Sequence, residues 1–227
     1  MFRAMQAGNR TYSVAKDVPE CVPVFPLSGA LLLPGGQMPL NIFEPRYLEM
    51  IDTAIRTDRV IGMIQPKFNG EAGDKDKPEL CAVGCLGRIS SFSETGDGRY
   101  LVSLQGICRF RIKEELHART PFRQCRITPF ASDLDEAADS EDVNRADLLR
   151  VFKAYLDANE LDADWDSVKR AGNETLVNAL SMMSPYGPAE KQALLEAPDL
   201  KSRAETLIAL TEMALARDKD VSGQMLQ

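Results

Sequence analysis

Hydrophobic and polar positions follow two different periods along this chain, one in each half. In the first half, short apolar runs are separated by Gly, Pro, Asn and Asp, which is typical of strands joined by turns. Residues 108–113 alternate strictly between apolar and basic side chains, the period of a strand with one buried face. The pattern predicts strands over residues 22–25, 38–43, 60–64, 80–92, 100–104, 107–113 and 122–128.

Only one helical pattern interrupts these predicted strands. Its apolar residues are spaced three, four, seven and eight positions after the first one, which gives the helix one apolar face: Tyr47, Met50, Ile51, Ala54 and Ile55. Because closure removes the exposed edges of a sheet, many short strands favour a closed or nearly closed antiparallel barrel. We expect the helix to seal this barrel.

The second half has the helical period instead. An apolar stripe over residues 148–156 predicts one helix, and residues 174–183 predict another. Two more follow, with Gly187 before Pro188 at a first helical position and Asp199 as an N-cap. Four helices joined by short loops predict a compact bundle.

The charge distribution supports a division at about residue 131. Residues 1–130 carry 17 Lys and Arg against 14 Asp and Glu, or +3, whereas residues 131–227 carry 10 against 20, or −10. We therefore predict a flexible tail over residues 1–19, a barrel domain over 20–131, a helical bundle over 132–220 and a second flexible tail over 221–227.

Composition narrows the cellular setting. The chain is 44% hydrophobic and 27% charged, and no stretch approaches the roughly 18 consecutive apolar residues that a membrane span requires. The first twenty residues lack the apolar core of a secretory signal. Five cysteines, several of them in strand-like runs, fit a reducing compartment. We expect a cytoplasmic protein without membrane contact.

No pattern in the chain supports a catalytic or metal site. There is no glycine-rich GxxxxGK phosphate loop, and His117, the only histidine, has no evident nucleophile beside it. Cys81 and Cys85 lie about 13 Å apart on an extended strand at about 3.3 Å per residue, too far to share one ion. An acidic calcium-like run at residues 162–166 lacks the required glycine and the final glutamate. We predict no cofactor, no metal and no enzymatic activity.

A basic stripe is the main candidate for an anion contact. Arg109, Arg111 and Lys113 share one face of a predicted strand, and such a face can bind nucleic acid. The acidic chain and the absence of aromatic residues on that face argue against this partner. An ordinary wet face, or a face docked on the acidic second half, is the competing interpretation.

The corner formed by Glu44, Pro45, Arg46 and Tyr47 joins a predicted strand to the predicted helix. Pro45 fixes its own φ and keeps Glu44 extended, so the strand ends there. Glu44 then lies near the free N–H groups of the helix, and Arg46 points sideways towards a neighbouring loop. These features favour a structural corner over a catalytic site.

The same corner carries a resemblance to a known family. Residues 22–55, VPVFPLSGALLLPGGQMPLNIFEPRYLEMIDTAI, resemble the opening of the N-terminal substrate-binding domain of Lon proteases, in the form found in stand-alone bacterial Lon-domain proteins and cereblon-type proteins. Later segments, LVSLQGICRFRI and KQALLEAPDLKSRAETLIAL, agree in order. The resemblance implies an α+β fold: a PUA-like antiparallel pseudo-β-barrel followed by a C-terminal helical bundle.

The resemblance also implies a role in binding polypeptides. The family domain is thought to engage unfolded or tagged chains, and a chain of this length has no room for the ATPase and protease modules. We therefore expect an ATP-independent, non-catalytic module that binds unfolded or extended polypeptide and acts as an adaptor in proteolysis or protein quality control, with a protease or chaperone as a further partner.

We expect the binding groove between barrel and bundle. Its candidate lining is Leu32, Leu33, Met38 and Tyr47, for each of which packing in the core is the competing interpretation. Two other hypotheses remain at this stage. One is an RNA-binding barrel, motivated by the PUA-like architecture and the basic stripe, and the other is an enzyme that uses Glu44, Arg46 or His117.

Overall fold

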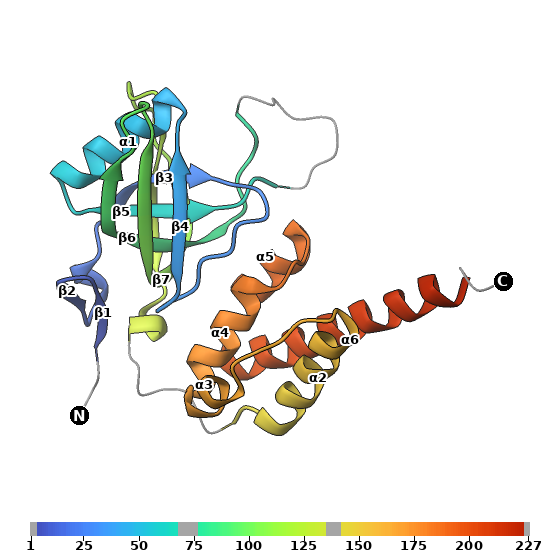
Figure 1. Ribbon diagram of the computed structural model, residues 1–227. Coiled ribbons are helices and arrows are strands. Elements are labelled where there is room, and N and C mark those ends of the chain that lie inside the picture. Colours follow the sequence, from blue (N-terminus) through green and yellow to red (C-terminus); the bar gives the residue numbers. More distant parts are fainter. Residues whose placement is uncertain (1–3, 68–76, 135–141, 225–227) are drawn as a thin grey trace.

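The computed structural model describes residues 4–67, 77–134 and 142–224, with side chains up to Arg217. Figure 1 shows a β-barrel and a group of helices side by side, with the last helix extending away from the barrel. The predicted α+β fold, a barrel followed by a helical bundle, is confirmed. None of the described helices is both long and apolar enough to cross a membrane.

The barrel is built from six strands, which run in the sheet order β4-β7-β6-β5-β3-β8. A further pairing of β8 with β7 closes five of them into a ring and leaves β4 outside it. The strands are β3 (Cys21–Pro26), β4 (Gln37–Ile42), β5 (Val60–Ile64), β6 (Val83–Glu94), β7 (Tyr100–Glu115) and β8 (Arg123–Pro129).

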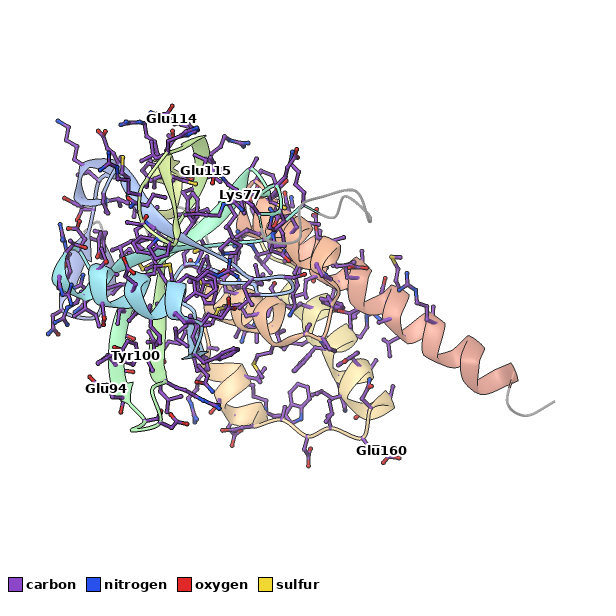
Figure 2. All side chains as sticks on the ribbon, turned by 90° about the horizontal axis from the view of Figure 1, so that it is seen from above. Lys77, Glu94, Tyr100, Glu114, Glu115 and Glu160 are labelled. Atoms are coloured by element: carbon purple, nitrogen blue, oxygen red, sulfur yellow. The ribbon has the colours of Figure 1, made fainter. Side chains whose placement is uncertain are left out.

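Two features of the barrel differ from the sequence-based expectation. β3 and β5 pair in parallel, because β4 and the first helix lie between them in the chain and return it to the same end of the sheet. The segments 100–104 and 107–113 are one continuous strand, β7. Its first part pairs with β4 and its last part with β8. Its two ends therefore lie on opposite sides of the barrel (Figure 2): Tyr100 lies beside Glu94, whereas Glu114 and Glu115 lie near Lys77.

Residues 4–19 do not form the flexible tail that we expected. They form a hairpin of β1 (Met5–Ala7) and β2 (Arg10–Tyr12), followed by a short 3-10 helix η1 (Ala15–Asp17). The hairpin is bound because its apolar side chains enter a core cluster, where Ala7 and Tyr12 are fully buried. The side-chain amide of Gln105 also bonds to the hairpin backbone, accepting from Gly8 N and donating to the carbonyl of Gln6.

The helices follow their local sequence signals. Among the described residues of the barrel half, one α-helix is present, α1 (Pro45–Arg56), and a further 3-10 helix, η3 (Ala131–Leu134), follows β8. The bundle comprises α2 (Arg145–Ala158), α3 (Trp165–Arg170), α4 (Asn173–Met183), α5 (Pro188–Glu196) and α6 (Leu200–Gln224).

Caps explain two of these helices directly. The acidic run that resembles a calcium loop instead begins α3, a helix that we did not predict, since the carboxylate of Asp164 accepts from the backbone N–H groups of Asp166 and Ser167. Asp199 caps α6 as predicted, because its carboxylate accepts from Ser202 N at 2.7 Å. The α6 helix continues to Gln224 through part of the predicted C-terminal tail, and residues 225–227 lie outside the described residues.

Barrel and bundle share one hydrophobic core. The larger cluster of buried residues combines barrel residues such as Leu104 with bundle residues such as Val177 and Leu194, all fully buried. The smaller cluster fills the barrel beneath the N-terminal hairpin. Because the larger core crosses the boundary, the two halves stabilise each other.

Candidate functional site

A cleft of about 610 Å³ lies between the barrel and the bundle. One wall is the segment of residues 29–31 and 34–36 together with the start of β4. The other wall is formed by α4 and by Lys191 of α5, and the lining is completed by Gln105 of β7 with Met5 and Gln6 of the N-terminal hairpin. The predicted position of a groove, around the LLLPGG segment and between the two halves, coincides with this cleft.

Methionines dominate the apolar lining of the cleft. Four of the nine methionines in the chain contribute to it: Met5, Met38, Met182 and Met183. Met183 is 80% exposed, and the sulfur of Met182 lies directly over Gly36, where any side chain would meet it. Unbranched, polarisable methionine side chains adapt to partners of different shapes, so this lining suits ligands that vary in sequence.

Hydrogen bonds hold the two walls in place. The side-chain amide of Asn178 on α4 donates to the carbonyl of Pro34 at 3.1 Å, and Lys191 on α5 donates to the carbonyl of Gly29 at 2.9 Å. Asn178 is buried and also accepts from Arg203. The loop that forms the barrel wall is therefore tied to the bundle at both ends.

Arg109 is not the surface anion contact that we predicted. Its side chain is 4% exposed and pairs with Asp133 of η3 at 2.7 Å. The same guanidinium donates to the carbonyls of Leu195 and Ala197 at the C-terminal end of α5, where the helix dipole is negative. The strict alternation of this strand breaks at Arg109 because the end of α5 covers it, which leaves Arg111 and Lys113 as the exposed members of the predicted stripe.

Arg109 belongs to a buried polar network between the barrel and the bundle. Arg203 on α6 donates to the carbonyl of Leu194 at 3.0 Å, and burial, together with the positive charge of Arg109, lowers the pKa of Arg203 to about 10. Gln192 on α5 donates to Val83 O of β6, and Gln65, which is 1% exposed, donates to Gln192. We call these residues, Gln65, Arg109, Asp133, Gln192 and Arg203, the sealed side of the interface.

The four residues predicted to line the groove lie in different parts of the structure. Leu32 and Leu33 are 1% and 0% exposed and lie in the shared core, so the prediction that they line the groove is wrong. Met38 does line the cleft, and its role in binding stays a prediction. Tyr47 lies elsewhere, beside a smaller pocket of about 170 Å³ that it shares with Arg46, Phe122, Arg123 and four prolines.

The Glu44 corner has the geometry of a rigid joint. Pro45 is the first residue of α1, and the carbonyl of Glu44 accepts from Tyr47 N and Leu48 N. Glu44 is the N-cap residue and so lies near the free N–H groups as expected, but its side chain does not bond to them. It pairs with Arg46 at 2.8 Å, so Arg46 braces Glu44 and not a neighbouring loop. The Arg46 guanidinium also lies 4.6 Å from the centre of the Tyr47 ring, whose pKa is raised by burial.

The other candidates for chemistry are separate from the cleft. His117 is exposed on the segment after β7. Burial raises the pKa of the Cys85, Cys108 and Cys125 thiols, so they act as small apolar side chains. Within the described part of the chain, no three His, Cys, Asp or Glu side chains come together in a way that could hold a metal ion.

Sequence reasoning missed Met5, Met182 and Met183. Met5 was assigned to a tail, so its place beside the cleft was not foreseen. The adjacent pair Met182 and Met183 did carry a signal, because consecutive helical residues point about 100° apart and a narrow buried face rarely takes both. An exposed methionine at the end of α4 could have been inferred from that pair.

Comparison with known proteins identifies the family of this domain. The family model described as the ATP-dependent protease La (LON) substrate-binding domain matches residues 21–212, which include both walls of the cleft except Met5 and Gln6. The chain belongs to this family. The family resemblance inferred from the sequence is therefore confirmed.

Curated relatives of this Lon substrate-binding domain are full-length Lon proteases. Lon protease 2 of Myxococcus xanthus is 28% identical over 204 residues, which cover 86% of this chain and 24% of that protein. A Lon protease of Anaeromyxobacter dehalogenans is 26% identical, again over 86% of this chain and 23% of that protein. The chain thus spans about a quarter of the length of these relatives.

Two solved structures have the same fold. A Lon N-terminal domain protein from Xanthomonas campestris superposes with a TM-score of 0.61 at 22% identity, over 83% of this chain and 97% of that one. The N-terminal domain of a Mycobacterium avium complex Lon protease gives a TM-score of 0.63 at 20% identity, over 85% and 98% of the two chains. At these identities the likeness establishes the fold.

Proposed function

We propose that this protein is a polypeptide-binding module that holds unfolded or extended chains in the cleft between barrel and bundle. The observation that carries the proposal is the methionine lining of a cleft in a Lon substrate-binding domain. Apolar segments are exposed in unfolded chains and buried in folded ones, so an adaptable apolar cleft selects for unfolded partners without reading one sequence. The role is that of an adaptor that presents such chains to a protease or chaperone.

Binding of a permanently unfolded protein tests this function. Reduced and carboxymethylated α-lactalbumin, labelled with a fluorophore, is titrated with the protein and followed by fluorescence anisotropy. We expect saturable binding, and the native disulfide-bonded form of the same protein should not bind. Met183→Asp places a charge in the cleft and should weaken binding about tenfold, the equivalent of about 1.4 kcal/mol.

The chain offers a matched control for this variant. Met213 on α6 is 52% exposed and does not line the cleft, so Met213→Asp adds the same charge to another part of the surface. We expect it to bind like wild type. Equal affinities of the two variants, or equal binding of native and unfolded α-lactalbumin, would contradict the proposal.

Salt dependence separates this function from RNA binding. A contact with phosphates weakens steeply as salt rises, whereas burial of apolar side chains changes little. The same titration at about 50 and 200 mM salt, with a single-stranded RNA oligomer as the second probe, therefore gives two distinct outcomes. Steeply salt-dependent RNA binding without binding of the unfolded protein would replace the present proposal.

A further inference from the structure

Strand β4 is the free edge of the barrel sheet. Among the residues that the structure describes, each of the other five strands of this sheet has a neighbour on both sides, whereas β4 pairs with β7 alone. A free edge presents backbone N–H and C=O groups without partners, and such a row is a template for another strand. Native proteins often blunt such edges with proline, and β4 contains one, Pro39.

The position of Pro39 fixes which backbone groups face outwards. Pro39 lies opposite Ser103 of β7 in a continuous ladder, although it has no N–H to donate. The ladder is therefore held by the residues on either side of it, which alternate with Pro39 in direction. Gly36 lies two residues before Met38 and therefore directs its backbone groups the same way. Its carbonyl accepts from Gly106 N of β7 at 2.8 Å, which confirms this assignment.

It follows that Gln37, Pro39 and Asn41 direct their backbone groups to the free edge. Gln37 and Asn41 each present an N–H and a C=O there, and Pro39 presents only a C=O. Within the described part of the chain, neither of the two N–H groups donates to a backbone acceptor outside the sheet. The side chains of all three residues are exposed, so the edge is open to solvent.

This edge forms part of the methionine cleft. Gln37 and Pro39 both line it, and Met182 and Met183 on α4 form the facing wall. A ligand in the cleft thus meets the free edge of β4 on one side. On the other side it meets a wall of α4 in which methionines lie beside the polar residues Glu174 and Thr175. Main-chain hydrogen bonds supply affinity that does not depend on sequence, and alternate side chains of an added strand reach the apolar wall.

We propose that the cleft binds an extended apolar polypeptide segment as an additional β-strand on β4. Gln37 and Asn41 are the two donors, about 13 Å apart at about 3.3 Å per residue, and Pro39 leaves a gap between them. Gln37 lines the cleft, and Asn41 lies beyond it on the same edge of β4. The proposal rests on the proposed function and adds the conformation of the bound chain and the backbone groups that hold it. A second copy of this protein, paired edge to edge through β4, is the rival occupant.

Peptides with methylated backbone nitrogens test strand addition. The probe is a fluorescent eight-residue peptide in which threonine and leucine alternate between two terminal lysines. N-methylation of every leucine, or of every threonine, removes the donors from one edge of the peptide while side chains are kept. We expect one of the two methylated peptides to lose about tenfold or more in affinity and the other to bind within about twofold of the parent.

The outcomes separate the two proposals. If both methylated peptides bind like the parent, strand addition is wrong and binding through side chains in the cleft still stands. If the parent peptide does not bind, or binds Met183→Asp as tightly as wild type, both proposals fail. A protein that is dimeric, and becomes monomeric only when Asn41→Pro is introduced, would show by sedimentation that a second copy occupies the edge.

The protein side of the contact can be tested in the same assay. Asn41→Pro removes one outward N–H that the ladder to β7 does not use, so the fold should persist with an unchanged thermal transition. We expect about a fivefold loss in peptide affinity, and a smaller loss for Asn41→Ala, which keeps the N–H. Hydrogen exchange of the wild-type protein adds an independent readout, since peptide should slow exchange of the Gln37 and Asn41 amides. Unchanged exchange at both amides in the presence of saturating peptide would overturn strand addition.

Discussion

The two sides of the contact between barrel and bundle are built from different chemistry. On the sealed side, charged and amide side chains bond to backbone carbonyls of α5 and β6, and Arg109 and Asp133 form a buried ion pair. On the open side, α4 faces β4 across a cleft lined by methionines. Hydrogen bonds are directional, whereas apolar contacts are not, so the first side fixes the arrangement of the two halves and the second leaves room for a ligand.

Two residues connect the two sides. Gln65 of the sealed side accepts from Gly29 N in the wall of the cleft at 2.9 Å. Asn178 accepts from Arg203 of the sealed side and donates to Pro34 in the wall of the cleft. The wall is therefore held by the same network that fixes the two halves. Under the proposed function, a polypeptide would therefore enter the cleft by moving methionine side chains, without separating barrel from bundle.

Loss of Arg109 should have the largest effect on stability. Arg109→Ala leaves the carboxylate of Asp133 buried without its charge partner and leaves two carbonyls of α5 without a donor. Breaking a buried ion pair in this way costs about 3 to 5 kcal/mol, and we expect a decrease of that size in the free energy of unfolding measured in urea.

Arg111 is the matched control for this change. It lies two residues further along the same strand and is exposed, and its guanidinium carbon lies 5.8 Å from the centre of the Phe130 ring. Arg111→Ala should cost less than about 1 kcal/mol. If both variants lost the same stability, the sealed side would not depend on the buried pair.

Gly36, on the cleft wall, and Gly106, in β7, should lose different amounts of stability when each is replaced by alanine. A side chain on Gly106 would meet the backbone carbonyl of Leu33, which cannot move without disturbing the core. A side chain on Gly36 would mainly meet the flexible end of Met182 and lies 3.1 Å from the same carbonyl. We expect Gly106→Ala to cost about 1 to 3 kcal/mol or more, and Gly36→Ala less than about 1 kcal/mol.

Urea unfolding of the two glycine variants gives the measurement. The comparison is between a rigid contact, that of Gly106 with the backbone of Leu33, and an adaptable one, that of Gly36 with the side chain of Met182. A larger loss for Gly36→Ala than for Gly106→Ala would show that Met182 is fixed in place and that the cleft wall is not adaptable.

Local signals predicted much of the fold correctly, while contacts between distant segments decided what was missed. Pro45 and Asp199 begin helices where the sequence indicated, because capping depends on neighbours in the chain. The burial of Arg109 could not be inferred, since it depends on the end of α5 more than 80 residues later. Alternation along β7 gave the direction of this side chain but not what covers that face.

The candidate site shows the same limit. The position of the cleft followed from the two-part architecture, but Leu32 and Leu33 were assigned to its surface because an apolar loop looks the same in sequence whether it is buried or exposed. The packing of Tyr12, a residue of the N-terminal hairpin, against the barrel core was missed for a related reason. A short N-terminal segment has no periodic pattern that reveals which surface it covers.

The smallest expected effect is a dependence of stability on pH, which arises because water is excluded from the buried side of β7. Burial raises the pKa of Cys108, next to Arg109 in the chain, to about 12 from an ordinary value of 9.0. In the unfolded chain this thiol ionises as pH approaches 9, whereas in the folded protein it keeps its proton. Stability should therefore fall as pH rises, by roughly 0.8 kcal/mol for this thiol between about pH 8 and 9.5.

The contribution of Cys108 can be isolated by comparing slopes. Wild type should lose more stability over this interval than Cys108→Ala, because the variant lacks this thiol. Cys125, whose pKa is raised by burial to about 11, adds a loss of the same sign in both proteins. The interval ends below the pKa of Arg203, about 10, because loss of that proton from the folded state would act in the opposite direction. Cys21→Ala, at the exposed cysteine, should keep the wild-type slope in urea unfolding at the two pH values. If Cys108→Ala also keeps that slope, water reaches the thiol in the folded protein, and the region beside Arg109 is less sealed than its burial indicates.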